Sequence, residues 1–110
     1  MIKNIESQND FNEVLNNQKL CIVDFSAVWC GPCRMMEPVL ENTASEYGDK
    51  FNFYKVDIDR NQELASKFSI MYVPTFVILK NGVEVSRKSG YIEKEDFENF
   101  ILENFKKTEN

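Results

Sequence analysis

The order of strand-like and helix-like patterns in this chain of 110 residues predicts an α/β fold with one mixed five-stranded sheet and four helices. The apolar run Leu20–Val28 shows no alternation, which indicates a strand buried on both faces, as in a parallel sheet. Asn81-Gly82 separates two strand-like runs, and both central positions of a type I′ hairpin turn need a positive φ. We therefore expect parallel crossovers first, an antiparallel hairpin later, and helices on both faces of the sheet.

The first elements alternate between strand and helix. Lys3–Ile5 can form a short strand. A helix ending near Asn16 follows, because apolar residues recur at i, i+3 and i+4. Ser7 to Asp10 offer several N-cap candidates at its start, and Asp10 with Glu13 has the spacing of a capping box. The apolar face of this helix comprises Phe11, Val14 and Leu15.

A longer helix is expected over Pro32–Tyr47, directly after the buried strand. Gly48 occupies the position of a left-handed C-terminal cap. Phe51–Asp57 forms the next strand, and Asn61 can cap a short helix after it. The stripe of apolar residues on the longer helix comprises Met36, Val39, Leu40, Ala44 and Tyr47.

Thr75–Lys80 and Val83–Lys88 form the two arms of the expected hairpin. A C-terminal amphipathic helix follows, and its last residues, Lys106–Asn110, are expected to fray. No repeat, linker or second domain is evident, so residues 1–110 are expected to form one domain. The apolar face of the last helix comprises Phe97, Phe100, Ile101 and Phe105.

Composition excludes several classes of protein. Hydrophobic residues make up 43% of the chain, which is typical of a packed core and not of a disordered protein. The net charge of -5 and the lack of a basic run argue against nucleic acid as a partner. No apolar stretch is long enough to span a membrane, and the polar first residues do not resemble a signal peptide, so we expect a cytosolic protein. The absence of histidine excludes Cys-His and Ser-His nucleophile pairs.

The motif Trp29-Cys30-Gly31-Pro32-Cys33 stands where the buried strand gives way to the long helix. Cysteines at i and i+3 of a helix start lie on one face, close enough to form a disulfide. Backbone amides and the helix dipole stabilise the thiolate of Cys30, which we expect to be exposed and to attack a substrate disulfide. Cys33, one turn further and more buried, is expected to resolve the mixed disulfide.

A zinc site is the main alternative, because Cys-x-x-Cys is also half of many zinc-binding motifs. Structural zinc usually takes four Cys or His ligands, and this chain has three cysteines and no histidine. Cys21 lies in the middle of the buried strand, where we expect it to pack as a small apolar side chain. We therefore expect no metal, and in a reducing cytosol the motif indicates redox chemistry.

The segment Val23–Cys33 resembles the active-site segment of the thioredoxin family, and Val73–Phe76 is similar to the family's cis-proline segment. Lys80–Gly82 resembles its hairpin turn. The resemblance covers nearly the whole chain, since further residues fall at matching intervals. It implies the thioredoxin fold and an electron carrier that reduces protein disulfides with no bound cofactor of its own. The residues at matching intervals are Pro38, Lys55, Asp59 and Gly90.

Asp24 is a lone carboxylate in the apolar strand, and the residues allow two interpretations. It can face outward, or it can be a buried carboxyl with a raised pKa that takes the proton of Cys33 through a water molecule. The resemblance implies the second interpretation, with Lys55 on the adjacent strand as the charge partner of Asp24.

Pro74 could be an ordinary turn proline and Trp29 a core residue. The resemblance implies instead a cis bond at Pro74, opposite the two cysteines, with the Val73 backbone free to bind an extended substrate segment. Trp29 then belongs to a flat apolar docking surface for varied protein partners. The other members of that surface are Gly31, Pro32, Val73 and Gly90.

Gly31-Pro32 carries no charge that would overstabilise the Cys30 thiolate, so it resembles the reductant branch of the family. Three residues depart from the common pattern. Ser26 stands where many members have tryptophan, Tyr72 where the residue is usually smaller, and Cys21 is an extra thiol without an assigned role.

The implied partners are a flavin-dependent thioredoxin reductase, which supplies electrons from NADPH through its FAD, and disulfide-containing proteins. The resemblance suggests substrates of the peroxiredoxin, ribonucleotide reductase or methionine sulfoxide reductase type, acted on by a monomer. Two other functions stay open at this point. One is a disulfide oxidase or isomerase, and the other is a non-catalytic binding subunit built on the same scaffold.

Overall fold

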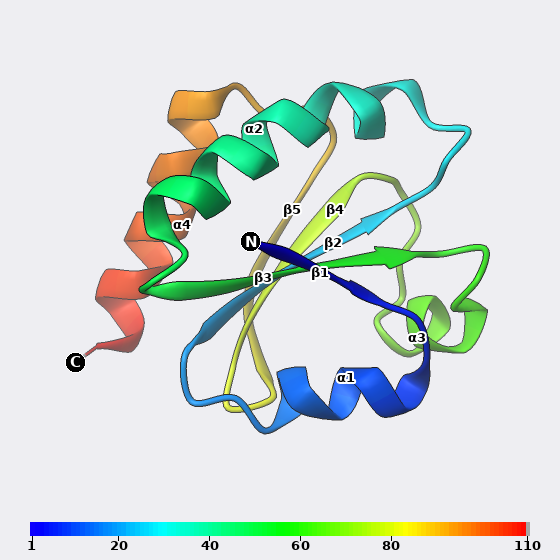
Figure 1. Cartoon of the computed structure of the whole chain (residues 1–110), viewed down its shortest axis with the longest axis horizontal. Coiled ribbons are helices and arrows are strands. Elements are labelled where there is room, and N and C mark those ends of the chain that lie inside the picture. The colour runs from blue at the N-terminus through cyan, green and yellow to red at the C-terminus, as the bar shows by residue number, and fades with distance from the viewer. Residues whose placement is uncertain (110) are drawn as a thin grey trace.

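The computed structural model describes residues 1–109, and Asn110 lies outside the described residues. Strands and helices follow in the order expected from the sequence (Figure 1). The strands are β1 (Ile2–Ile5), β2 (Leu20–Ser26), β3 (Phe51–Asp57), β4 (Thr75–Lys80) and β5 (Val83–Ser89). The helices are α1 (Gln8–Leu15), α2 (Gly31–Tyr47), α3 (Gln62–Lys67) and α4 (Lys94–Thr108).

The sheet has the strand order β1-β3-β2-β4-β5, which puts β2 in the middle. β3 pairs in parallel with both β1 and β2, and β4 pairs antiparallel with β2 and β5. All seven residues of β2 are buried, which confirms the strand buried on both faces. The five-stranded mixed sheet with four helices, counted over residues 1–109, confirms the predicted fold class.

Helices cover both faces of the sheet, with α2 and α4 on one side and α1 and α3 on the other (Figure 1). Aromatic pairs anchor each layer. On the α4 side, the rings of Phe76 and Phe97 meet edge to face with centroids 5.0 Å apart. On the α1 side, Phe11 meets Phe68 in the same way at 5.5 Å. The central strand β2 packs into both layers, with Ile22 in the core on the α4 side and Phe25 in the core on the α1 side. The two cysteines follow the carboxyl end of β2, at the start of α2.

The hairpin between β4 and β5 turns as predicted. Asn81 and Gly82 have φ values of 52° and 77°, both in the left-handed region. A Cβ atom added at Gly82 would lie 2.8 Å from the carbonyl oxygen of Leu15, so glycine is required by the turn and by the close approach of α1.

The predictions about helix ends were right in part. Ser7, one of the predicted N-cap candidates, caps α1, because its Oγ accepts a hydrogen bond from the Asp10 backbone N–H; Asp10 itself is not the cap. Gly48 has φ −62° and ψ −18°, so it continues the right-handed conformation. Asn61 is the N-cap residue of α3, as predicted, but its side chain makes no bond to the helix; its amide donates instead to the carbonyl oxygens of Ile5 and Asp57.

The C-terminal helix also continues further than expected. α4 remains helical through Thr108, where the sequence predicted fraying from Lys106 onward. The Lys80 ammonium donates to the Thr108 carbonyl oxygen and to the Glu109 carboxylate, each at 3.2 Å. Lys106 and Lys107 in the last turn also interact favourably with the negative end of the helix dipole.

Candidate active site

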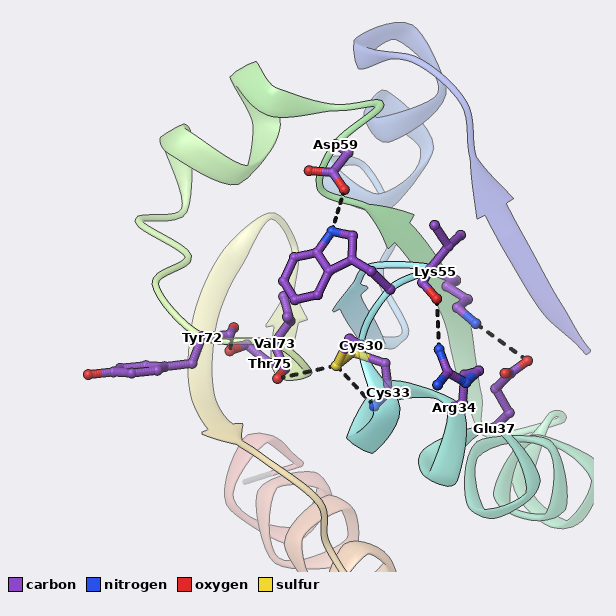
Figure 2. The surroundings of a disulfide bond; sticks show 11 residues. Cys30, Cys33, Arg34, Glu37, Lys55, Asp59, Tyr72, Val73 and Thr75 are labelled. Carbon is purple, nitrogen blue, oxygen red and sulfur yellow. Dashed lines mark hydrogen bonds and ion pairs between the residues drawn. A yellow bond between two sulfur atoms is a disulfide. The ribbon is translucent and has the colours of Figure 1, made fainter.

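Cys30 and Cys33 stand at the beginning of α2 and are joined by a disulfide, with Cα atoms 5.2 Å apart (Figure 2). Cys30 is the N-cap residue, and its Sγ accepts a hydrogen bond of 3.1 Å from the Cys33 backbone N–H. An N-terminal amide directed at a sulfur stabilises negative charge on it. The two cysteines therefore form a redox-active pair at the helix start.

Exposure does not distinguish the two cysteines, contrary to the prediction. Cys30 is 4% exposed and Cys33 is 3% exposed, because Cys30 packs in a small apolar cluster with Ala27 and Val73. Their surroundings differ instead. Cys30 Sγ lies 3.6 Å from the Val73 carbonyl oxygen (Figure 2), whereas Cys33 lines a pocket on the inner side of the motif.

The segment before β4 forms an ordered edge beside Cys30. The Val73–Pro74 peptide bond is cis. Thr75 Oγ1 donates to the Tyr72 carbonyl oxygen at 2.6 Å, and the Gly90 N–H donates to the Pro74 carbonyl oxygen at 2.8 Å. These bonds hold the backbone of residues 72–74 next to the disulfide, with Pro74 buried and Val73 half-buried.

Trp29 is 64% exposed, so it is not a core residue. Its indole N–H donates to Asp59 Oδ2 at 2.8 Å, which orients the ring beside the cysteines. Asp59 lies at a position that matches the thioredoxin family, but no local sequence pattern predicted its hydrogen bond with Trp29. It comes from the loop after β3, 30 residues away, so only the fold reveals the pairing.

The residues predicted to form a docking surface differ in their exposure. Pro32 is exposed, and Gly31 and Gly90 are half-buried with open space where a Cβ would stand. Residue type alone did not reveal which neighbouring apolar side chains stay outside the core. Further exposed apolar side chains are chain neighbours of the predicted surface residues: Val28 precedes Trp29, Met71 and Tyr72 precede Val73, and Tyr91 follows Gly90.

Asp24 is 2% exposed, so the outward-facing interpretation is wrong. Burial raises the pKa of its carboxyl to about 7, and the Glu37 carboxylate adds to the rise, while the Lys55 ammonium opposes it. Among residues 1–109, no hydrogen bond reaches Oδ1 of Asp24. Lys55 lies directly opposite Asp24 in the parallel β2–β3 register, but its ion pair at 3.8 Å is with Glu37.

A pocket of about 390 Å³ is lined by residues of β1, β2 and β3 and of the first turns of α2, and it has room for water. Cys33, Lys55 and Glu37 line it, so the structure brings the second cysteine and the predicted lysine together. The Arg34 guanidinium, also in its wall, donates to the Val28 carbonyl oxygen at 2.9 Å (Figure 2). Glu37 and Arg34 carry no sequence signal for this position, because charged residues on a helix usually face solvent.

Cys21 and Ser26, two of the three departures from the family pattern, are both buried in β2. Burial raises the pKa of the Cys21 thiol to about 11, so this cysteine stays protonated and unreactive at neutral pH. Within residues 1–109 there is no cluster of three or more side chains of the types that bind metal ions. In the same part of the chain, no helix combines the length and the apolar character needed to cross a bilayer.

Comparison with known proteins agrees with this geometry. The family model named Thioredoxin matches residues 2–103. A thioredoxin from Alicyclobacillus acidocaldarius is 44% identical over 89 residues, covering 81% of this chain and 85% of the relative. Bacillus subtilis thioredoxin is 41% identical over 85 residues, covering 77% and 82% of the two chains.

Solved structures give the same result. The crystal structure of a Malassezia sympodialis thioredoxin superposes with a TM-score of 0.88 at 35% identity, covering 94% of this chain and 90% of that one. A thioredoxin from Nicotiana alata superposes with a TM-score of 0.84 at 39% identity, covering 94% and 91%. Thioredoxins are disulfide oxidoreductases that carry no bound cofactor. With its disulfide between Cys30 and Cys33 at the start of α2, this chain belongs to the thioredoxin family.

Proposed function

We propose that this protein reduces disulfide bonds in other proteins, with Cys30 as the attacking and Cys33 as the resolving cysteine. The position of Cys30 supports this assignment most directly. Its sulfur receives the Cys33 amide hydrogen bond and lies beside the Val73 carbonyl oxygen, at the edge where an extended substrate segment can bind. The Cys30 thiolate attacks one sulfur of the substrate, the substrate S–S bond breaks, and its other sulfur leaves as a thiolate.

Cys33 completes the reaction in this proposal. Its thiol gives its proton to the Asp24 carboxylate through a water molecule, and its sulfur attacks Cys30 Sγ. The mixed disulfide breaks, the substrate leaves with both sulfurs reduced, and the Cys30–Cys33 disulfide forms. A carboxyl with a pKa of about 7 suits this role, because it accepts and releases a proton near neutral pH.

The direction of electron flow is part of the proposal. Gly31-Pro32 and the absence of histidine support a reductant over an oxidase or isomerase. We expect the monomer to work in the cytosol, where a thioredoxin reductase returns electrons from NADPH through its FAD. Trp29, Val73 and the exposed apolar residues around them offer a surface for protein substrates more than for one small molecule.

A coupled assay tests this function. Insulin, NADPH and a thioredoxin reductase are mixed with the protein, and NADPH consumption and insulin reduction are followed together. We expect turnover that depends on all components. A redox potential close to that of strong oxidants, measured against glutathione, would contradict the assigned direction.

A further inference from the structure

Glu37 lies on α2 one helical turn after Cys33, and its carboxylate faces the Lys55 side chain (Figure 2). Glu37 Oε2 lies 3.8 Å from Lys55 Nζ. Lys55 is also the residue directly opposite Asp24 in the β2–β3 register. Lys55 on β3 is therefore the register partner of one carboxylate residue, buried in β2, and the ion-pair partner of another, on the surface of α2.

The two carboxylates compete for this cation. Asp24 is buried, and no hydrogen bond within residues 1–109 reaches its Oδ1, so a close ammonium would stabilise its ionised form strongly. Lys55 forms its ion pair instead with Glu37, whose side chain is half exposed. Such an exposed pair adds little stability by itself, so its main consequence is where it holds the ammonium.

We propose that Glu37 is a positioning residue that holds the Lys55 ammonium away from Asp24 and so determines when Asp24 carries a proton. This inference rests on the proposed function where it concerns the rate of disulfide exchange. Within residues 1–109, Glu37 forms no hydrogen bond to either sulfur. It acts on Asp24 through Lys55 and through its own negative charge. Both effects favour the protonated form of Asp24.

The other ionisable groups around the pocket do not replace this pair. Glu6 lies after β1, Arg34 on α2, and Asp57 and Arg60 at and after the end of β3. Arg34 is already bonded to the Val28 carbonyl oxygen. Lys55 and Glu37 are the charged groups that act on the Asp24 carboxyl, with opposite signs.

Glu37→Gln tests the inference in the oxidised full chain. The pKa of Asp24 is read from the pH dependence of its side-chain carboxyl ¹³C chemical shift. We expect this pKa to fall by roughly 0.5–1, since a nearby negative charge is removed and Lys55 becomes available to Asp24. In a Lys55→Met background, the same substitution should have a clearly smaller effect. Glu103→Gln, which removes one charge from α4, is the matched control and should leave the Asp24 titration unchanged.

The kinetic readout separates this inference from the proposed function. The pH midpoint of insulin reduction should move down with the pKa of Asp24 in Glu37→Gln. An Asp24 titration identical in wild type and Glu37→Gln would overturn the inference. If the pKa of Asp24 falls while the pH dependence of insulin reduction is unchanged, the effect of Glu37 on Asp24 is supported and the proton-acceptor role of Asp24 is contradicted.

Discussion

Asp24→Asn is expected to stabilise the oxidised protein, and to do so increasingly as the pH rises. The Asp24 side chain is 2% exposed and lacks a hydrogen bond at Oδ1 from any residue in 1–109. Ionising it within the fold therefore leaves a poorly compensated buried charge. Asparagine has nearly the same shape and no charge to bury.

The size of the effect follows from the pKa of Asp24. Burial raises this pKa from 3.8 to about 7, so the folded protein binds the proton more tightly than the unfolded chain does. The carboxyl then adds stability that is fully present below about pH 4 and is lost as the pH rises toward 7. The complete loss is about 4 kcal/mol, and the part between pH 5 and pH 8 is about 2–3 kcal/mol.

Urea unfolding at pH 5 and pH 8, followed by the fluorescence of the single tryptophan, measures this loss. The gain in unfolding free energy from Asp24→Asn should be larger at pH 8 than at pH 5 by about 2–3 kcal/mol. An unsatisfied asparagine amide costs about 1–3 kcal/mol at either pH, so it cancels from this difference. Glu103→Gln is the control for charge alone. An equal gain at both pH values would refute the buried, proton-binding carboxyl.

Two further substitutions test contacts around the site and in the fold. Asp59→Ala should lower the fluorescence anisotropy of Trp29, because the ring loses its 2.8 Å hydrogen bond, while Asp59→Asn keeps an acceptor and should change it less. Equal anisotropy in wild type and Asp59→Ala would show that the bond does not orient the ring. Gly82→Ala should destabilise by about 1–2 kcal/mol or more, since alanine at φ 77° is strained and its Cβ would meet the Leu15 carbonyl oxygen. Unfolding midpoints equal within error for Gly82→Ala and wild type would contradict this reasoning.

Most of the fold could be predicted from the sequence, because the local patterns that indicate strands, helices and turns agreed with one another. The unalternating apolar run became the central strand, and Asn81-Gly82 became the predicted turn. Helix ends were less predictable. The end of α4 depends on a distant side chain, because the Lys80 ammonium donates to the Thr108 carbonyl oxygen.

The site divided in the same way. The cysteines and Asp24 were found because their residue types are unusual in their local setting. Asp59 and Glu37 were not assigned contacts, because each acts on a residue that is distant in the chain, Trp29 and Lys55 respectively. The expected exposure of Cys30 was wrong. A residue at a helix N-cap is often exposed, but here the loop that contains Val73 packs against Cys30 and buries it.

Trapping of a mixed disulfide tests the unequal roles of the two cysteines most directly. Cys33→Ser is incubated with insulin, and the covalent products are mapped by mass spectrometry, with Cys30→Ser as the matched control. We predict that Cys33→Ser accumulates a disulfide between Cys30 and an insulin cysteine, and that Cys30→Ser neither traps nor reduces insulin. A trapped bond at Cys33 in Cys30→Ser, or sustained insulin reduction by that variant, would contradict the assignment of Cys30 as the attacking residue.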